Sequence, residues 1–194
     1  AIDDEELRKY SKNWHKPAVS KDCGGMELHL CRCATEVDFM INVPVMKGHC
    51  QTHITCALKN MKGLLPNREK RRFHAEGLHR PIAHLALGIH QDFILVDSIC
   101  GDLSFEDGGN PTQMDRLMAA VDPVLMDAYV CQLLGYEVEE VPYVTMAEEL
   151  YVGSADLAHA KIRELNAPIH PLGKADKDKV MKLAEIAQEV ESCS

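Results

Sequence analysis

The sequence has no apolar run of about 18 residues, the length needed to cross a bilayer, so we expect no membrane-spanning segment. Residues 1–9 have neither the basic start nor the apolar stretch of a secretory signal. Internal repeats, low-complexity tracts and Gly/Ser linkers are also absent. With 194 residues the chain can bury a core without disulfides. We therefore expect a single cytoplasmic α/β domain over residues 1–194.

Closely spaced cysteine pairs of the Cys-x-x-Cys type are missing, although the sequence has eight cysteines. Their absence argues against an iron–sulfur cluster held by a local motif. Cysteines spread along a chain of this size favour reduced thiols in a cytosolic protein over a disulfide framework. Cys31 and Cys33 are predicted to occupy alternate positions on one face of a strand, where burial is the ordinary role of cysteine.

Glycine-rich phosphate-binding patterns are absent too, since neither Gly-x-x-x-x-Gly-Lys nor Gly-x-Gly-x-x-Gly occurs. The sequence therefore predicts neither an ATP site nor a dinucleotide site by motif, and it leaves any cofactor unknown. Aromatic residues make up only 5% of the chain, and the net charge is −9. This combination is a poor electrostatic footprint for a nucleic-acid-binding protein.

Strand and helix patterns alternate along the chain. Strands are predicted at Met26–Cys33, Val37–Val43 and Phe93–Asp97, and the last two should be buried in one sheet. Helices are predicted at Glu5–Trp14, Thr52–Gly63, Pro81–His90, Asp122–Leu134 and, with an apolar stripe, Val180–Val190. Asp122, Pro123 and Gly135 supply the cap, the first-turn proline and the stop of one helix. Strand, helix, strand predicts an α/β fold with a mostly parallel or mixed sheet flanked by helices.

Positive charge is concentrated between Asn42 and Arg80. This segment holds eight lysines and arginines and two glutamates, a net charge of +6, so the remainder of the chain carries −15. Four of the ten histidines also lie in it: His49, His53, His74 and His79. Such asymmetry indicates a surface that attracts anions, and the alternative interpretation is a solvated basic face without a ligand.

A helix over Thr52–Gly63 would place its apolar residues on one arc. Its other arc carries hydroxyl, amide and ammonium groups, which are typical of small-molecule sites. The loop before it, 45–51, would lie at a helix N-terminus and at the carboxyl end of a strand, where α/β proteins bind ligands. We therefore predict a pocket with Lys47 and His49 as catalytic residues. Its predicted substrate-binding residues are Asn42, Thr52, Thr55, Lys59, Asn60, Arg72, His74 and Asp97.

Metal ions are alternatives at two places. His49 and His53 stand at i and i+4 with cysteines nearby, a spacing that can bind zinc on a helix, but Lys47 would repel a cation. Asp97, Asp102 and Glu106 would reach the same sheet edge if their strand neighbours the one before Lys47, and could hold Mg²⁺ there. An acidic surface turn also explains this second group, and we assign no metal ligand.

A resemblance to a known family rests on an ordered set of motifs. Asn42-Val-Pro-Val-Met-Lys-Gly-His-Cys-Gln-Thr52 and Lys59-Asn-Met-Lys-Gly-Leu-Leu-Pro66 resemble the signature of the family labelled domain of unknown function 362. Lys70–His74 and Asp122–Asp127 resemble its later motifs, so that the similarity covers about residues 35–153. The resemblance implies a site without a named reaction. Some relatives carry a ferredoxin-like cluster domain, and most have a longer region upstream, which implies that this chain is an N-terminally truncated copy.

The leading hypothesis is an enzyme or enzyme subunit that binds a small anionic substrate bearing phosphate or carboxylate. Lys47 and Lys59 would neutralise its charge, and His49 would be the acid–base group. A hypothesis of another class is a non-catalytic or redox-partner module that works with an iron–sulfur protein. A metal-dependent hydrolase is a third hypothesis, and the sequence does not specify the reaction.

Overall fold

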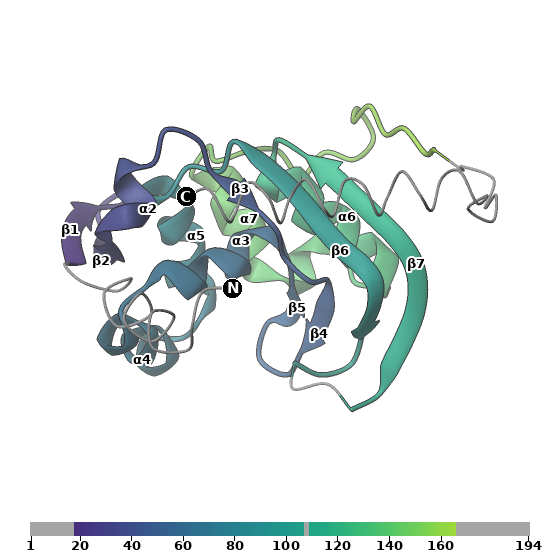
Figure 1. Ribbon diagram of the computed structural model, residues 1–194, viewed down its shortest axis with the longest axis horizontal. Helices are drawn as coiled ribbons and strands as arrows, with labels where there is room; N and C mark the ends of the chain where they lie inside the picture. The colour runs from purple at the N-terminus through teal and green to yellow at the C-terminus, as the bar shows by residue number, and fades with distance from the viewer. Residues whose placement is uncertain (1–17, 107–108, 166–194) are drawn as a thin grey trace, which may run out of the picture. The chain divides into compact units, whose positions relative to one another are not determined.

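The computed structural model describes residues 18–106 and 109–165 (Figure 1). Its elements, in chain order, are β1 (Ala18–Asp22), β2 (Glu27–Cys31), α2 (Arg32–Glu36), β3 (Ile41–Asn42), β4 (Lys47–His49), β5 (His53–Thr55), α3 (Ala57–Asn60), η1 (Met61–Leu64), α4 (Asn67–Glu76), α5 (His79–Gly88), β6 (Phe93–Asp102), β7 (Pro111–Ala120), α6 (Pro123–Leu134), η2 (Val138–Glu140) and α7 (Pro142–Glu149). All of them belong to a compact unit of residues 8–160; of the other unit, residues 1–7 and 161–194, only 161–165 are described.

A mixed three-stranded sheet with the order β3-β6-β7 forms the framework of this unit (Figure 1). β3 runs parallel to β6, with Ile41 opposite Phe93, and β7 returns antiparallel to β6. The helices α3, α4 and α5 lie between β3 and β6 in the chain, as a parallel pair requires a crossover connection. The predicted α/β fold with a mixed sheet is therefore confirmed.

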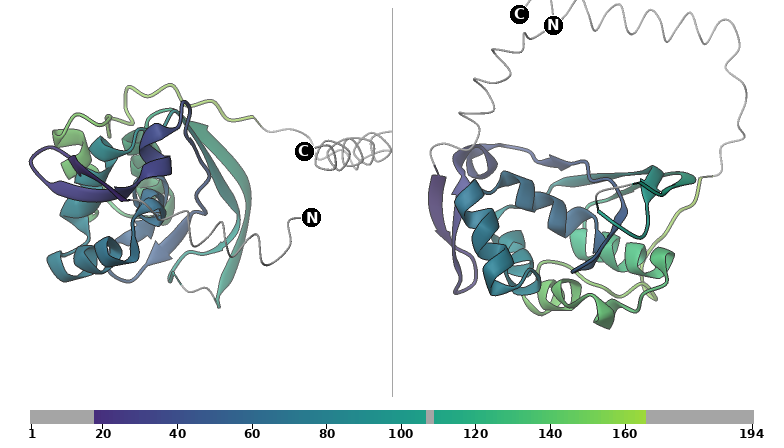
Figure 2. Two further views of the ribbon diagram at one scale, coloured as in Figure 1. Left: turned by 60° about the vertical axis from the view of Figure 1, so that its left-hand side comes forward. Right: turned by 90° about the horizontal axis from the view of Figure 1, so that it is seen from below.

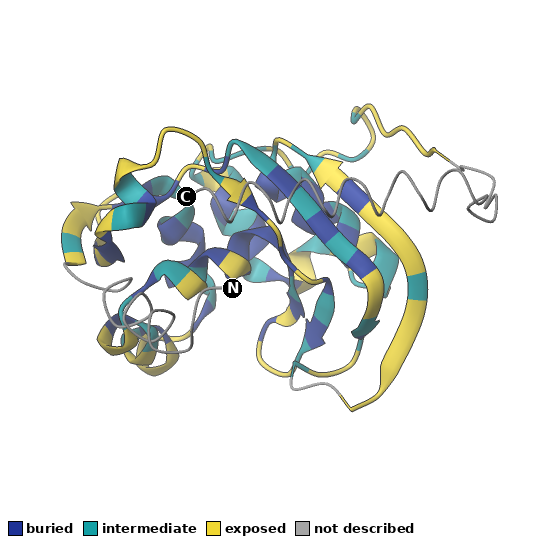
Figure 3. Cartoon of the chain, viewed as in Figure 1, coloured by how far each residue is buried: buried dark blue, intermediate teal, exposed yellow. Residues whose placement is uncertain are grey.

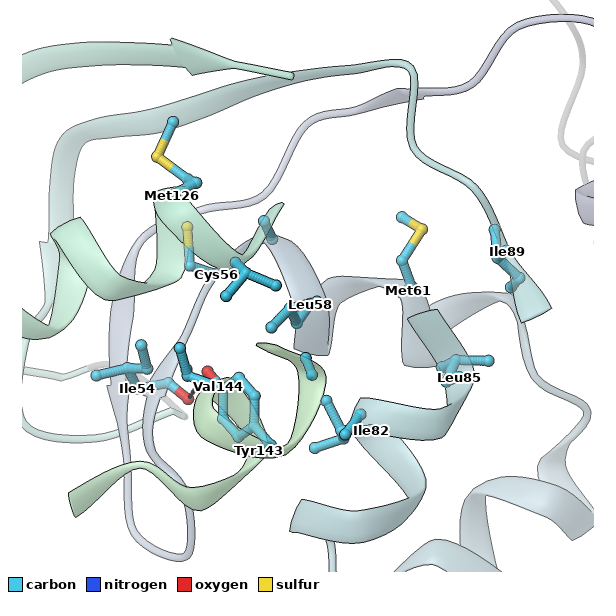
Figure 4. Packing of buried hydrophobic residues seen from close by; sticks show 14 of the residues in the cluster. Ile54, Cys56, Leu58, Met61, Ile82, Leu85, Ile89, Met126, Tyr143 and Val144 are labelled. Carbon is cyan, nitrogen blue, oxygen red and sulfur yellow. Dashed lines mark hydrogen bonds between the residues drawn. The ribbon is translucent and has the colours of Figure 1, made fainter. Parts of the chain in front are cut away.

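Helices cover one face of the sheet, and the core lies between the two layers. In Figure 2 the green helices α6 and α7 lie on one side of β6 and β7. Ile94 and Val96 of β6 are fully buried on this inner face. The apolar cluster lies beneath this face of the sheet, and Figure 4 shows two of its members, Leu58 of α3 and Tyr143 of α7. Burial of these side chains provides the main force that holds the layers together.

The outer face of the sheet corrects the prediction of a buried strand over Val37–Val43. Only Ile41 and Asn42 form a strand, and Phe39, Ile41 and Val43 are 61%, 56% and 57% exposed. β3 is an edge strand, and no layer made of described residues covers this face, on which Leu117 of β7 is also 62% exposed (Figure 3). An apolar run therefore forms a strand without becoming core here.

The predicted helix over Thr52–Gly63 is also wrong in its first half. β4 and β5 pair as an antiparallel hairpin, with Lys47 opposite Thr55 and Gly48 opposite Ile54. Threonine and isoleucine have stiff β-branched side chains that favour strands, and pairing with β4 satisfies their backbone groups. Helix begins only at Ala57 and continues as a 3₁₀ turn to Leu64.

Other predictions fare better where local signals are strong. Asp122 accepts hydrogen bonds from the N–H groups of Val124 and Leu125, and Gly135 ends α6 in the left-handed conformation, as predicted. The predicted strands Met26–Cys33 and Phe93–Asp97 correspond to β2 and to the first half of β6. Cys33, however, lies in α2 and not in a strand.

The helices predicted at Glu5–Trp14 and Val180–Val190 lie outside the described residues. Within those described, no helix has the length and apolar character that crossing a membrane requires.

Candidate functional site

The β4–β5 hairpin packs tightly against the loop that follows β6. At Gly48 a Cβ atom would lie 2.3 Å from the carbonyl oxygen of Leu103, so only glycine allows this approach. The Nζ of Lys47 donates a hydrogen bond of 2.9 Å to the backbone oxygen of Glu106. The close contact therefore brings the 103–106 loop over the residues at the end of β4.

Glu106 is the acidic group of this site. Its carboxylate accepts hydrogen bonds of 3.0 Å from both the N–H and the thiol of Cys50. The Nε2 of His49 lies 3.7 Å from the same carboxylate. The hydrogen bonds from Cys50 lower the pKa of Glu106 to about 2, because they stabilise its charged form. The Glu106 carboxylate is therefore negatively charged at neutral pH and is held by hydrogen bonds from Cys50.

The ring of His49 is held in one tautomer. Its Nδ1 accepts hydrogen bonds from the N–H groups of Gln51 (3.0 Å) and Thr52 (3.3 Å), so the proton of the neutral ring is on Nε2. Burial, followed by the charge of Lys59, lowers the pKa of His49 to about 4. At neutral pH His49 is therefore an uncharged donor whose N–H faces Glu106.

Lys59 is the most deeply buried lysine of the site, with 7% exposure. Its Nζ donates a hydrogen bond of 3.0 Å to the hydroxyl of Thr55 in β5, four residues earlier in the chain. Burial, followed by the charge of Lys62, lowers the pKa of Lys59 to about 7, and the charge of Lys47 acts in the same direction. The amine of Lys59 therefore loses its proton at lower pH than an exposed lysine does.

A lysine–histidine pair, Lys62 and His74, adjoins Lys59. The Nζ of Lys62 lies 2.6 Å from the Nε2 of His74, and burial lowers the pKa of both side chains. Lys59 and Lys62 both lower the pKa of His49 and of His74 through their charges. We call this group the lysine–histidine cluster. It consists of Lys47, His49, Lys59, Lys62 and His74, with Glu106 as its carboxylate.

Three of the predicted substrate-binding residues have structural partners instead. Asn42 is buried, and its amide nitrogen donates to the oxygens of Ala57 (2.9 Å) and Gln91 (2.6 Å). The amide of Asn60 donates to the side-chain oxygen of Asn42 at 2.7 Å. Thr52 is also buried, with its hydroxyl on the backbone oxygen of Ile54. The bonds of Asn42 fasten α3 to β3 and so hold Lys59 in place, whereas the bond of Thr52 is local to the hairpin.

Arg72 and Asp97 lie in other surroundings. Arg72 pairs with the buried Glu69 at 2.8 Å and donates to the backbone oxygen of Glu27, which ties α4 to β2. Asp97 accepts a hydrogen bond from the N–H of Ile99 and lies within β6, which continues to Asp102. The structure therefore joins Lys47, His49, Thr55, Lys59 and His74 of the predicted set, and leaves these two outside.

Asp127 was missed as a residue that positions the site. It is fully buried in α6, and its carboxylate accepts hydrogen bonds from the N–H groups of Ala57 (2.7 Å) and Leu58 (3.1 Å) at the start of α3. Burial raises its pKa to about 7. The signal in the sequence was a single acidic residue in an otherwise apolar helix, because a buried carboxylate needs hydrogen-bond donors around it.

The same site also contains a candidate set of metal ligands. Ligand atoms of His49, Cys50 and Glu106 lie within 4.8 Å of one another, which is close enough for three ligands of one ion. However, Nδ1 of His49 already accepts two backbone hydrogen bonds, so a metal on Nε2 would displace the one proton of the neutral ring and leave an imidazolate. Lys59 and Lys62 add positive charge beside it. The donor set therefore fits an anion better than a cation.

A hollow lined by other residues lies in the same unit. It measures about 300 Å³ and is lined by Ala128, Gln132, Gly135, Tyr136, Glu137, Val138 and Leu157. None of these is a predicted site residue, and the lining has no cationic group that could neutralise an anion. The lysine–histidine cluster, with its perturbed pKa values, is the better candidate for a functional site.

Comparison with known proteins places the chain in a family. It is 26% identical over 133 residues to the thylakoid-associated protein sll1697 of Synechocystis sp. (strain ATCC 27184 / PCC 6803 / Kazusa), a match that covers 63% of this chain and 40% of that protein. No solved structure matches. The profile of the family described as "Domain of unknown function (DUF362)" matches residues 5–132, about two thirds of the chain. The chain therefore belongs to the DUF362 family.

Proposed function

We propose that the lysine–histidine cluster binds a small anion bearing a phosphate or carboxylate group. The observation that carries this proposal is an imbalance of charge: three lysines, Lys47, Lys59 and Lys62, share the cluster with one carboxylate. Burial of part of this charge is unfavourable unless an opposite charge compensates for it. A bound anion would supply that charge and would return the pKa of Lys59 toward its ordinary value.

Glu106 supports this proposal by its own contacts. Its carboxylate accepts a hydrogen bond from the N–H of Cys50 and faces the Nε2–H of His49. Donors of these kinds also recognise a ligand carboxylate or phosphate. A ligand could bind beside Glu106 or displace it. In either case His49 serves as a neutral donor that orients the anion, while Lys59 is the group that titrates near neutral pH.

Calorimetric titration with inorganic phosphate and with acetate at pH 7 tests this function. In Lys62→Ala and Lys47→Ala the loss of one charged hydrogen bond should weaken binding by about 1–3 kcal/mol, and higher salt should weaken binding to the wild type. Lys161→Ala, which removes an exposed lysine outside the 8–160 unit, is the matched control and should bind as the wild type does. Equal affinity of all four proteins, or no binding of either anion, would contradict the proposal.

A further inference from the structure

Lys59 is a buried lysine that forms no ion pair with another described residue. Among residues 18–106 and 109–165, no carboxylate oxygen lies within 4.0 Å of its Nζ, whereas its exposure is only 7%. Lysine is almost never buried this far unless an acid accompanies it, because a desolvated ammonium is costly. A buried, unpaired lysine therefore calls for a functional explanation.

The surroundings of Lys59 favour its uncharged form. Burial is the largest cause, and the charges of Lys62 and Lys47 also oppose protonation of the amine, whereas Glu106 and Cys50 act in the opposite direction. Thr55 offers the amine one neutral hydroxyl. With a pKa of about 7, a large fraction of the amine carries a free electron pair at neutral pH. A desolvated lysine next to other cations is one of the recognised ways to obtain a nucleophilic amine.

The position of the amine is also well determined. Lys59 belongs to α3, whose first N–H groups are held by Asp127, and the next residue, Asn60, bonds to the buried Asn42. A helix fastened at both ends limits the freedom of the side chain that it carries. This rigidity is what a covalent site requires, since the reacting atoms must be held in position.

We infer that Lys59 forms an imine with the carbonyl carbon of a small anionic aldehyde or ketone. The inference rests on the proposed anion-binding function, because Lys47 and Lys62 would hold the phosphate or carboxylate group of the same molecule. The Nζ electron pair forms a C–N bond as the C=O π bond opens. A proton passes from nitrogen to the new oxygen, and the carbinolamine then loses water to leave the C=N bond. No oxidant or reductant is needed.

Other nucleophiles of the site are less suited to this step. The thiol of Cys50 donates a hydrogen bond to Glu106, and this hydrogen bond is the main cause that raises the pKa of Cys50. It therefore stays protonated, and a thiol is a much weaker nucleophile than a thiolate. Lys62 is engaged with His74 at 2.6 Å. Lys59 is thus the amine to which covalent labelling should be directed.

Pyridoxal 5′-phosphate, an aldehyde that carries a phosphate group, is a direct probe. The full chain would be incubated with it at pH 7 and reduced with sodium cyanoborohydride, which makes the imine permanent, and the labelled lysines identified by peptide mass spectrometry. We expect Lys59 to be labelled at a concentration at least tenfold below that needed for the exposed Lys161, with a rate that rises around pH 7. Labelling of exposed lysines with none on Lys59 would overturn the inference.

Two further arms separate this inference from the anion-binding proposal. Lys59→Arg removes the nucleophilic amine and should lose the rapid label, and inorganic phosphate should slow the labelling of Lys59 in the wild-type chain. Pyridoxal without its phosphate should label Lys59 more slowly than pyridoxal 5′-phosphate does. If both aldehydes label Lys59 equally and phosphate does not compete, the anion site fails and the nucleophile stands. If phosphate binds but Lys59 is never labelled, the nucleophile fails and the anion site stands.

Discussion

Gly48 provides the sharpest structural test of the site. It lies in β4, where the hairpin touches the 103–106 loop, and a Cβ there would meet the oxygen and carbon of Leu103 at 2.3 and 2.6 Å and the carbon of Ser104 at 2.8 Å. All three are backbone atoms, which cannot turn aside as the end of a side chain can. In Gly48→Ala the hairpin and the loop must therefore separate by about 1 Å to reach ordinary contact distances of about 3.5 Å.

Two contributions lower the free energy of unfolding of this variant. Forcing an extra methyl group into a packed contact costs about 1–3 kcal/mol. The hydrogen bonds from Lys47 and Cys50 to Glu106 bridge the same two segments, and each contributes about 0.5–1.5 kcal/mol, so their partial loss adds to the cost. We expect Gly48→Ala to lower the free energy of unfolding by about 2–4 kcal/mol.

Urea unfolding followed by circular dichroism would measure this change. Gly63→Ala is the matched control, because its added Cβ would meet no described residue within 4 Å beyond its chain neighbours and the residue belongs to the 3₁₀ turn η1. Its free energy of unfolding should be unchanged or higher by up to about 1 kcal/mol, since alanine restricts the unfolded chain. If Gly48→Ala were as stable as Gly63→Ala, the hairpin and loop would not be in the contact described, and the geometry of Glu106 would be wrong with it.

Two other predictions concern buried titratable groups. Asp127→Ala leaves the N–H groups of Ala57 and Leu58 without an acceptor, at about 1–3 kcal/mol each, so thermal unfolding should begin well below the wild type, whereas the exposed Asp38→Ala should not shift it. His49 has a pKa of about 4 in the folded protein against 6.5 in an unfolded chain, so the unfolded state takes up the proton first as the pH falls. Its contribution to stability should be complete above pH 6.5 and should decline toward pH 4, by up to about 3 kcal/mol. Urea unfolding of wild type and His49→Gln at pH 7.5 and 4.5 measures this, and a difference independent of pH would contradict it.

Part of the candidate site was accessible to sequence reasoning because charge is a property of composition. The excess of lysine and arginine between Asn42 and Arg80 directed attention to Lys47, His49 and Lys59, and the structure brings these three into one cluster. The helical arc that was used to support the choice is not the reason, because residues 47–55 form a hairpin. Pairing between strands depends on partners that a local pattern does not name.

Glu106 and Asp127 illustrate what local patterns leave out. Glu106 lies 56 residues after Cys50 along the chain, and only the folding of the loop after β6 brings its carboxylate to the hairpin. Asp127 reaches α3 across 70 residues. In the sequence one is part of an acidic turn and the other is an isolated charge. Their roles follow from which backbone N–H groups happen to lack another acceptor.

What the sequence by itself determined is the set of features whose physical cause is local. The cap at Asp122, the left-handed stop at Gly135 and the strand–helix–strand order depend on neighbouring residues, and each is found in the structure. Only the tertiary structure decided that Ile41 would be exposed on an edge strand and that Lys59 would be buried beside other lysines. Burial and pKa depend on the neighbours that surround a side chain in space, and those neighbours come from distant parts of the chain.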